Sequence, residues 1–342
     1  MDSSAGYSVA IVGATGAVGE ALLDILQERK FPVSKLYLLA SERSAGKRLQ
    51  FHGKSVQVQR LDEFDFSQVQ IGLFSAGGEL SAEYAPKAGA AGCVVIDNTS
   101  HFRYDADIPL VVPEVNPQCV ADFKPRNIIA NPNCSTIQML VALKPIQDAV
   151  GITRINVATY QAVSGAGASG INELAGQTAN LLNAKPIESS VMPVQIAFNA
   201  IPQIGAFQEN GYTLEEMKMV WETQKIFGDE TITVNPTCVR IPAFYGHSEA
   251  VHVETVEPIA PAEVERLLAK APGVKLMKGE KYPTAVTESA GTDPVFVGRI
   301  RKDISHDNGI NMWVVSDNVR KGAALNSVQI AELLVEQNLI AN

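Results

Sequence analysis

The stretch Tyr7-Ser8-Val9-Ala10-Ile11-Val12-Gly13-Ala14-Thr15-Gly16-Ala17-Val18-Gly19 joins an apolar run to three glycines. Its first six residues predict a buried strand, and the apolar periodicity of Glu20 to Arg29 predicts a helix. A strand, a glycine turn and a helix in that order can bind a dinucleotide pyrophosphate. In such a site Gly13 makes the tight turn, Gly16 lets the backbone approach the phosphates, and Gly19 allows the helix to pack closely on the strand. The spacing is GxxGxxG rather than GxGxxG, so its place directly after a strand is what favours a cofactor site over a plain turn.

A second strand is predicted from Lys35 to Ala40, and the polar segment Ser41-Glu42-Arg43-Ser44 follows it. An acidic residue about 20 positions beyond the glycines commonly binds the ribose hydroxyls of NAD, and Glu42 fits that role. Arg43, flanked by two serines, instead suits the 2′-phosphate of NADP. We favour NADP, because Glu42 can turn to solvent while the guanidinium and hydroxyls surround an anion. The segment is also compatible with a solvated loop.

Two further strands, at 71–74 and 93–96, end in small or polar residues. Ligands bind at the carboxyl ends of parallel strands, so we expect Ala76, Gly77 and Asn98 to line the cofactor. Arg103 comes shortly after the second of these strands and is either a clamp for a substrate anion or a surface arginine.

The stretch Ile129-Ala130-Asn131-Pro132-Asn133-Cys134-Ser135-Thr136 follows the pattern strand, tight turn, cysteine and helix. A thiol in the first helical turn lies beside unpaired backbone N–H groups and the positive end of the helix dipole, and both favour the thiolate. The same N–H groups can hold the oxyanion that develops when sulfur attacks a carbonyl. The alternative is a buried structural cysteine. The pattern therefore makes Cys134 a candidate nucleophile.

Length and composition limit the class of protein. The chain has 342 residues, 46% of them hydrophobic, and a net charge of −9 with a pI near 5.2, which indicates two domains and makes nucleic acid an unfavourable partner. The start, Met1-Asp2-Ser3-Ser4, lacks the basic segment of a signal peptide, and no apolar run is long enough to cross a membrane. The four cysteines are scattered along the chain: Cys93, Cys119, Cys134 and Cys238. Their spacing predicts neither disulfides nor a metal site, and this favours a cytoplasmic protein.

After Cys134 the pattern changes to that of a second, α+β domain. Ile152 to Tyr160 alternates like an antiparallel strand, and a loop of small residues follows it. Leu214 to Ile226 predicts a helix on which Glu215 and Lys218 share one face. Other expected elements are strands at 231–241 and 250–257 on either side of Arg240 and His247, a strand and loop at 314–318, and a helix at 323–336 that packs back on the first domain. The predicted fold is α/β, with a Rossmann-type dinucleotide-binding domain at 1–133 with 318–342 and a mixed-sheet α+β domain at 134–317.

The chain resembles the aspartate-β-semialdehyde dehydrogenase family over nearly its whole length. The motifs that carry the resemblance are Gly13–Gly19, Ser41–Gly46, Ser75–Gly78, Asn131–Thr136, Tyr160–Gly167, Glu215–Lys218, Arg240–Pro242 with His247–Glu249, and Asp317–Ala324. One departure is Glu42, where related sequences more often carry a small residue.

The resemblance implies a role for each matching residue. Cys134 falls on the family's nucleophile, His247 on its acid/base and Gln161 on the residue that orients the substrate or intermediate. The substrate-binding positions fall on Arg240 and Glu215 for the amino-acid end, on Arg103 and Lys218 for phosphate, and on Asn133. The cofactor-binding positions fall on Gly13, Thr15, Gly16, Ala17, Val18, Ser41, Arg43, Ser44, Ser75, Ala76, Gly77, Ser164, Gly165 and Asn318.

The resemblance further implies NADP as cofactor, a homodimer or higher oligomer, and a place in lysine, threonine and methionine biosynthesis. The Cys134 thiolate would attack L-aspartyl 4-phosphate, phosphate would leave, and reduction of the thioester would give the semialdehyde while His247 handles the proton. Another phosphorylating dehydrogenase, acting on N-acetylglutamyl phosphate or a triose phosphate, is one alternative. A non-catalytic relative that keeps the fold is the other. Glu215, suited to a free ammonium, argues against an N-acetylated or sugar substrate.

Overall fold

A computed structural model describes residues 6–340 of the chain. The expectation about Met1-Asp2-Ser3-Ser4 lies outside these residues. The chain forms two compact units. The first comprises the residues up to Pro132 together with those from Ala323 onward, and the second comprises Asn133–Gly322.

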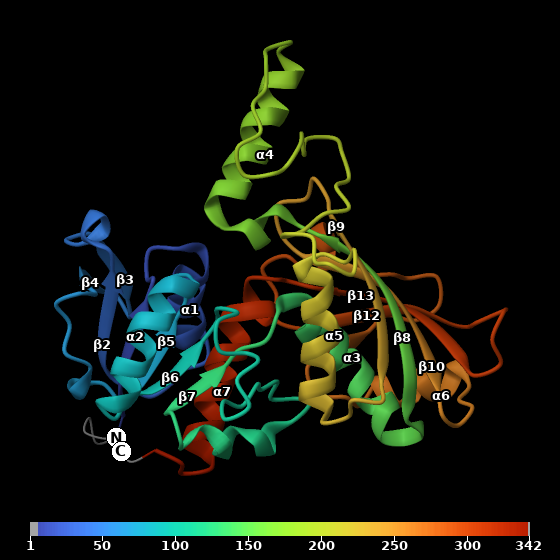
Figure 1. Cartoon of the computed structure of the whole chain (residues 1–342), viewed down its shortest axis with the longest axis horizontal. Coiled ribbons are helices and arrows are strands. Elements are labelled where there is room, and N and C mark those ends of the chain that lie inside the picture. The colour runs from blue at the N-terminus through green and yellow to red at the C-terminus, as the bar shows by residue number, and fades with distance from the viewer. Residues whose placement is uncertain (1–5, 341–342) are drawn as a thin grey trace. The chain divides into compact units, whose positions relative to one another are not determined.

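Within residues 6–340, the first unit is built on a seven-stranded sheet in the order β3-β4-β2-β1-β5-β6-β7 (Figure 1). All neighbours pair in parallel except β3 and β4, which form an antiparallel hairpin at one edge. The strands are β1 Tyr7–Val12, β2 Val33–Ala40, β3 Arg48–Phe51, β4 Lys54–Arg60, β5 Ile71–Phe74, β6 Val94–Asp97 and β7 Ile128–Ala130. The helices of this unit are α1 Ala17–Glu28, α2 Gly78–Ala90 and α7 Leu325–Glu336.

The connections β1-α1-β2 and β5-α2-β6 step in opposite directions across the sheet. Because such crossovers are right-handed, α1 and α2 cover opposite faces. The C-terminal helix α7 contacts α1, and its residues Val328, Ile330 and Leu334 belong to the core of the first unit. The prediction that the last helix packs back on the first domain is therefore confirmed.

The sheet reverses its order between β1 and β5, and this is where the glycine turn lies. Gly13 follows β1 with φ +86°, and a Cβ there would lie 2.8 Å from the Ser75 carbonyl oxygen after β5. A Cβ on Gly19 would lie 2.3 Å from the Gly13 oxygen, so the first turn of α1 packs directly on the glycine turn. Both predicted structural roles, the tight turn and the close packing, are confirmed. The turn thus lies at the point where open α/β sheets bind ligands.

Within the described residues, the second unit is built on a six-stranded mixed sheet in the order β11-β12-β13-β10-β8-β9. Its strands are β8 Ile152–Gln161, β9 Thr233–Arg240, β10 His247–Thr255, β11 Val274–Leu276, β12 Val295–Lys302 and β13 Gly309–Ser316. Its helices are α3 Cys134–Val150, α4 Gly167–Leu182, α5 Leu214–Phe227 and α6 Pro261–Leu268. The strand that starts at Ile152 pairs antiparallel with β10 but parallel with β9, so the antiparallel prediction holds on one side only.

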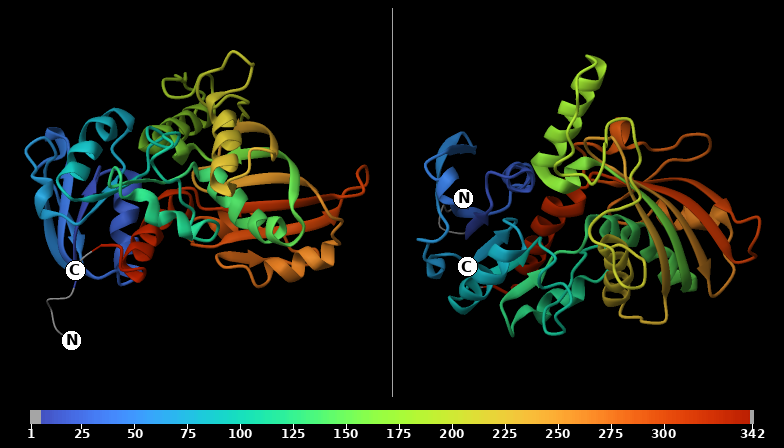
Figure 2. Two further views of the ribbon diagram at one scale, coloured as in Figure 1. Left: turned by 60° about the horizontal axis from the view of Figure 1, so that its bottom comes forward. Right: turned by 45° about the horizontal axis from the view of Figure 1, so that its top comes forward.

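Helix α3, which begins at Cys134, packs on this sheet through a fully buried side and contacts β8, β10, β12 and β13. By contrast, α4 projects away from the sheet, as Figure 1 and the right view of Figure 2 show. The chain that follows α4 is attached to this helix by Glu173. The Glu173 carboxylate accepts hydrogen bonds from three successive backbone N–H groups, those of Ser190 at 2.9 Å, Val191 at 2.6 Å and Met192 at 3.1 Å. None of the helices in residues 6–340 has the length and apolar character that a bilayer crossing requires.

Several predicted boundaries were wrong, each for a local reason. Helix α1 begins at Ala17 rather than Glu20, because Gly16 is its N-cap and Gly19 lies inside its first turn. Strand β10 begins at His247 rather than Ala250. Its polar start was not expected to be a strand, yet His247 and Glu249 are fully buried there. Arg240 is the last residue of β9, which begins at Thr233 rather than Thr231 and ends one residue before the predicted Ile241.

Candidate active site

Asn133 is the N-cap of α3 and Cys134 is its first residue. The segment has the predicted order, because β7 ends at Ala130 and a three-residue turn leads into the helix. The Asn133 Oδ1 accepts the backbone N–H groups of Ser135 at 3.0 Å and Thr136 at 3.3 Å. Cys134 is half-buried, so its sulfur lies at a helix N-terminus that solvent can reach. This is the environment that favours a thiolate.

The same capping contacts change one prediction. An N-cap side chain satisfies N–H groups that the helix leaves without partners. Since Asn133 already takes those of Ser135 and Thr136, the prediction that the first-turn N–H groups hold an oxyanion is wrong for these two. Another donor has to serve that purpose.

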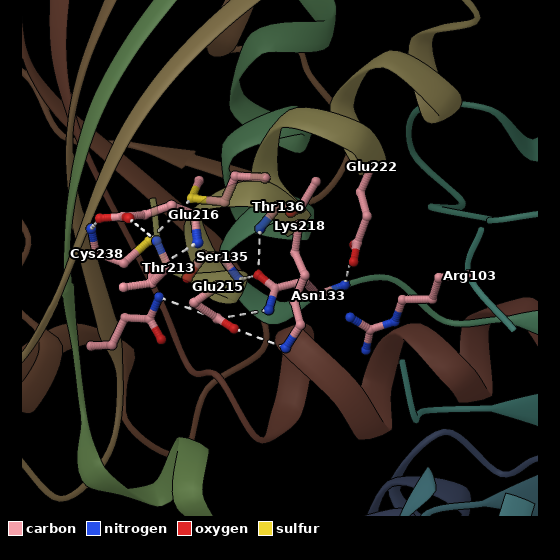
Figure 3. Close-up of polar contacts among 12 residues, drawn as sticks. Arg103, Asn133, Ser135, Thr136, Thr213, Glu215, Glu216, Lys218, Glu222 and Cys238 are labelled. Carbon is pink, nitrogen blue, oxygen red and sulfur yellow. Dashed lines mark hydrogen bonds and ion pairs between the residues drawn. The ribbon is translucent and has the colours of Figure 1, made fainter. Parts of the chain in front are cut away.

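A buried carboxylate, Glu215, lies at the centre of a polar cluster (Figure 3). Its Oε1 accepts from Asn133 Nδ2 at 2.8 Å and from Gln161 Nε2 at 3.4 Å, and its Oε2 pairs with Lys218 Nζ at 3.0 Å. Burial raises the pKa of Glu215, but the Lys218 ammonium, the Asn133 hydrogen bond and the Arg240 charge outweigh it and hold the pKa at about 2. Glu215 is therefore an anion at neutral pH. The predicted contact between Glu215 and Lys218 is confirmed.

Arg240 ends β9 opposite Gln161, the last residue of β8, and is buried. Its Nη1 donates to the carbonyl oxygen of Ala162 at 2.7 Å. Burial lowers the pKa of Arg240, while the charges of Glu215 and Cys134 oppose that shift. A Cβ on Gly165 would lie 2.7 Å from the Arg240 Nη1, so the small-residue loop after β8 approaches the guanidinium more closely than any larger residue allows.

His247 begins β10 and is fully buried. The Ala162 backbone N–H donates to its Nδ1 at 3.1 Å, so the neutral ring carries its proton on Nε2. Within the described residues, Nε2 has no hydrogen-bond partner. Burial and the Arg240 charge together lower the pKa of His247 to about 3, and the Glu215 charge opposes the shift. The imidazole is therefore neutral at pH 7, and its buried Nε2–H is left without a hydrogen-bond acceptor among the described residues.

Ser164 and Asn318, which the resemblance assigned to cofactor binding, are hydrogen-bonded to each other, and Asn318 also contacts the residue before His247. Ser164 Oγ and the Asn318 side chain are hydrogen-bonded at 3.0 and 2.9 Å, and Asn318 Oδ1 accepts the Gly246 backbone N–H at 2.9 Å. Both side chains are buried. In this structure they fix the turn that leads into His247.

Gly165 also lies in the second unit, and the other predicted cofactor residues belong to the first unit, around the switch point of its sheet. A Cβ on Gly16 would meet only the Gly13 oxygen, at 3.4 Å, so the protein itself leaves room over this glycine. Thr15 Oγ1 lies 3.3 Å from Ser44 Oγ, which joins the glycine turn to the end of β2. Ala17 and Val18 open α1, Gly77 is the N-cap of α2 with φ +98°, and Ala76 precedes it. This arrangement fits a dinucleotide pyrophosphate.

Near the end of β2, Ser41, Glu42 and Arg43 are exposed. The Glu42 carboxylate lies 3.3 Å from the Arg60 guanidinium, so it is directed at a cation of the protein. Asn98, expected to line the cofactor, instead uses its side chain within the fold, donating to the Phe74 carbonyl at 3.1 Å.

Arg103 also lies in the first unit and is buried, and its Nη2 donates to the Asn98 carbonyl at 2.9 Å. The second unit holds the remaining candidate residues of the catalytic and substrate sites: Cys134, Asn133, Gln161, Glu215, Lys218, Arg240 and His247.

Sequence reasoning missed two residues that touch this cluster. Glu222, fully buried on α5, accepts the Asn133 backbone N–H at 2.6 Å. Its position seven residues after Glu215 places both on one helix face, and this spacing was a signal available in the sequence. Gly322 is the other, because a Cβ there would lie 2.6 Å from the Cβ of Cys134. It lies within a quoted motif but had no assigned role.

Comparisons with known proteins agree with this geometry. The family described as "Semialdehyde dehydrogenase, NAD binding domain" matches residues 8–123, and "Semialdehyde dehydrogenase, dimerisation domain" matches residues 143–321. Aspartate-semialdehyde dehydrogenase of Shewanella violacea is 67% identical over 330 residues, which cover 96% of this chain and 98% of that protein.

Solved structures show the same likeness. The crystal structure of aspartate semialdehyde dehydrogenase II complexed with ASA from Vibrio cholerae has a TM-score of 0.97 and 68% identity, and covers 97% of this chain and 99% of that one. The Candida albicans aspartate semialdehyde dehydrogenase with NADP has a TM-score of 0.78 and 25% identity, and covers 98% and 100%. The chain therefore belongs to the aspartate-semialdehyde dehydrogenase family.

Proposed function

We propose that this protein reduces L-aspartyl 4-phosphate to L-aspartate 4-semialdehyde with NADPH and releases phosphate, in lysine, threonine and methionine biosynthesis. The observation that carries the proposal is the polar cluster of the second unit. There a half-buried cysteine at a helix N-terminus accompanies the Glu215–Lys218 pair, a buried Arg240 and His247, whose Nε2 has no hydrogen-bond partner in the part of the chain that the structure describes. The Vibrio cholerae relative, 68% identical, was crystallised with ASA, which supports this substrate class.

The amino-acid end of the substrate carries an ammonium and a carboxylate. Arg240 suits the carboxylate, because its planar guanidinium donates to two oxygens at once. Glu215 suits the ammonium, because its low pKa keeps it charged throughout the physiological range. A ligand ammonium has to share Glu215 with Lys218, which already lies 3.0 Å away. Lys218 is then available to a second anion, and we assign it, with Arg103, to the departing phosphate.

The Cys134 sulfur attacks the acyl carbon, and the bond to the phosphate oxygen breaks as phosphate leaves with the electron pair. A thioester on Cys134 remains, which Gln161 orients. When bound, NADPH supplies a hydride to the thioester carbon. His247 presents its Nε2–H to the oxygen that becomes negative, and the tetrahedral adduct collapses to the aldehyde and the Cys134 thiolate. The Ala162 N–H contact keeps the proton on Nε2 for this step.

We assign the cofactor site to the predicted dinucleotide-binding domain, residues 1–133 with 318–342, and we assign catalysis and the contact of a homodimer to residues 134–317. The room over Gly16 supports the cofactor assignment. The match of residues 143–321 to a dimerisation domain supports the homodimer. All four cysteines lie within the described residues and none forms a disulfide, which fits the reducing cytoplasm.

Arg43 provides the test of NADP preference. It is exposed beside Ser44 at the end of β2, while Glu42 is directed at Arg60. Replacing Arg43 with alanine should lower kcat/KM for NADPH about tenfold, because one charge-assisted hydrogen bond to the 2′-phosphate is lost. kcat/KM for NADH should change less than about twofold, since NADH lacks that phosphate.

Lys54→Ala is the matched control, since Lys54 is another exposed cation, on β4 of the same unit. Lys54→Ala should leave kcat/KM for NADPH and kcat/KM for NADH unchanged. A wild-type preference for NADH would contradict the proposed cofactor.

One assay tests the whole proposal. The purified protein is incubated with NADP, phosphate and L-aspartate semialdehyde, N-acetylglutamate semialdehyde or glyceraldehyde 3-phosphate, and NADPH formation is followed. Turnover should require phosphate and should be fastest with L-aspartate semialdehyde, because Glu215 recognises a free ammonium. A faster rate with either other aldehyde would identify a different phosphorylating dehydrogenase. No turnover with any of them would indicate a non-catalytic relative.

A further inference from the structure

Asn133, the residue before Cys134, is held through its backbone and its side chain by α5 and by α3 (Figure 3). Its backbone N–H donates to Glu222 Oε2 at 2.6 Å, and its Nδ2 donates to Glu215 Oε1 at 2.8 Å. Its Oδ1 accepts the N–H groups of Ser135 and Thr136. The position of Asn133 therefore depends on two carboxylates of a helix far away in sequence.

The two carboxylates have different surroundings. Glu215 and Glu222 are seven residues apart on α5 and thus face the same way, about two turns from each other. Glu215 Oε1 also accepts from Gln161 and its Oε2 pairs with Lys218, so a ligand ammonium at Glu215 competes with these contacts. Glu222 is fully buried and binds a backbone N–H. Its hold on Asn133 does not depend on the charged group that the proposed substrate brings.

We propose that Glu222 is a positioning residue, which keeps Asn133 and hence the Cys134 sulfur in place while Glu215 exchanges partners during turnover. The inference rests on the proposed function of Cys134 as nucleophile. Asn133 is joined to Cys134 by one peptide bond. It is also the N-cap that fixes the start of the helix that Cys134 begins. A displacement of about 1 Å at a reacting atom can cost about 100-fold in rate. The contact that joins the carboxylate to Asn133 is to a neutral N–H, so an acceptor oxygen at that place is what the positioning role requires.

Three variants separate position from charge. Glu222→Gln keeps an acceptor oxygen at the same reach and loses the charge, whereas Glu222→Asp keeps the charge but withdraws the oxygen by one methylene. Glu216→Ala is the matched control, since Glu216 is also a buried carboxylate on α5 but accepts the backbone N–H groups of Thr213 at 2.6 Å and Cys238 at 3.0 Å. Its loss should destabilise the unit without moving Asn133.

The kinetic readout is the split between kcat and KM for L-aspartate semialdehyde at saturating phosphate and NADP. Glu222→Asp should lower kcat by about 10- to 100-fold with KM within about threefold, because the sulfur is displaced while the substrate-binding groups remain. Glu222→Gln should keep kcat within about threefold of wild type. Glu216→Ala should keep kcat near wild type at a temperature where it is folded, whatever its melting temperature. An aspartate variant as active as the glutamine variant would overturn the proposal.

Amide hydrogen exchange provides a second readout that needs no catalysis. In Glu222→Asp, exchange of the segment 131–137 should be about fivefold faster than in wild type, because one buried hydrogen bond is lost. In Glu216→Ala it should match wild type. Unchanged exchange in Glu222→Asp would overturn the proposal even if activity falls. Exchange could be faster in Glu222→Asp while the wild-type protein is inactive on L-aspartate semialdehyde. That result would support the contact between Glu222 and the segment 131–137 and would refute only the proposed function.

Discussion

Replacing Cys134 with serine is expected to lower turnover of L-aspartate semialdehyde by on the order of 10⁴-fold or more, the range found when a covalent nucleophile is removed. The serine hydroxyl keeps the size of the side chain, but it does not ionise near neutral pH at the start of α3, where the thiol is favoured to do so. The measurement is kcat in the phosphate-dependent NADP reduction assay.

Two comparisons make this result specific to the sulfur at residue 134. The affinity of Cys134→Ser for NADP should remain within about twofold of wild type, because the cofactor residues around Gly13 belong to the first unit. Cys119→Ser replaces another partly buried thiol, one outside the cluster, and should retain wild-type activity. Substantial turnover by Cys134→Ser would remove this residue as the nucleophile.

The fold of the first unit could be predicted because its signals are local. The run before Gly13 is apolar and β-branched, and the glycine turn and the helix follow within twenty residues. The edge hairpin of β3 and β4 was not predicted, since its strands are short and half exposed and so lack a continuous apolar run. Helix α2 was missed as well, because its sequence contains Pro86 and because six of its 13 residues are glycine or alanine, which weakens the apolar periodicity.

The residues of the candidate site could be named from motifs, but the contacts among them could not be derived. Arg240 and Gln161 end two strands that lie side by side, and nothing in their separation by 79 residues indicates this pairing. The buried polar start of β10 does not resemble a strand either, because His247, Ser248 and Glu249 are buried by tertiary contacts rather than by pattern. Polar residues in buried strands break the hydrophobic period, and here the break coincides with the site.

Replacing His247 with asparagine is expected to lower kcat by about 10²- to 10⁴-fold, the usual contribution of a positioned proton carrier, with KM changed less than about threefold. Asparagine can accept the Ala162 N–H in place of Nδ1, but it has no group at the position of Nε2. His247→Gln is the informative companion, since its amide N–H can reach that position but cannot transfer a proton. If the imidazole moves a proton, the glutamine variant remains at least about tenfold below wild type. A normal kcat with a raised KM in His247→Asn would make His247 a binding residue only.

The same variant should also change how stability depends on pH. Burial, together with the Arg240 charge, lowers the pKa of His247 to about 3 in the folded protein, against an ordinary value of 6.5 for the imidazole. Between these values the unfolded chain binds a proton that the folded protein does not. Acid therefore favours unfolding, and stability falls as pH drops below about 6.5. At about 1.4 kcal/mol per pH unit, wild type should lose about 2 kcal/mol more of its unfolding free energy than His247→Asn between pH 7.5 and pH 5.0.

Urea denaturation of both proteins at the two pH values measures this difference. Equal losses would mean that the folded protein protonates His247 as readily as the unfolded chain does. The imidazole would then be a cation in mild acid, and the assignment of a neutral ring with its proton on Nε2 would be wrong.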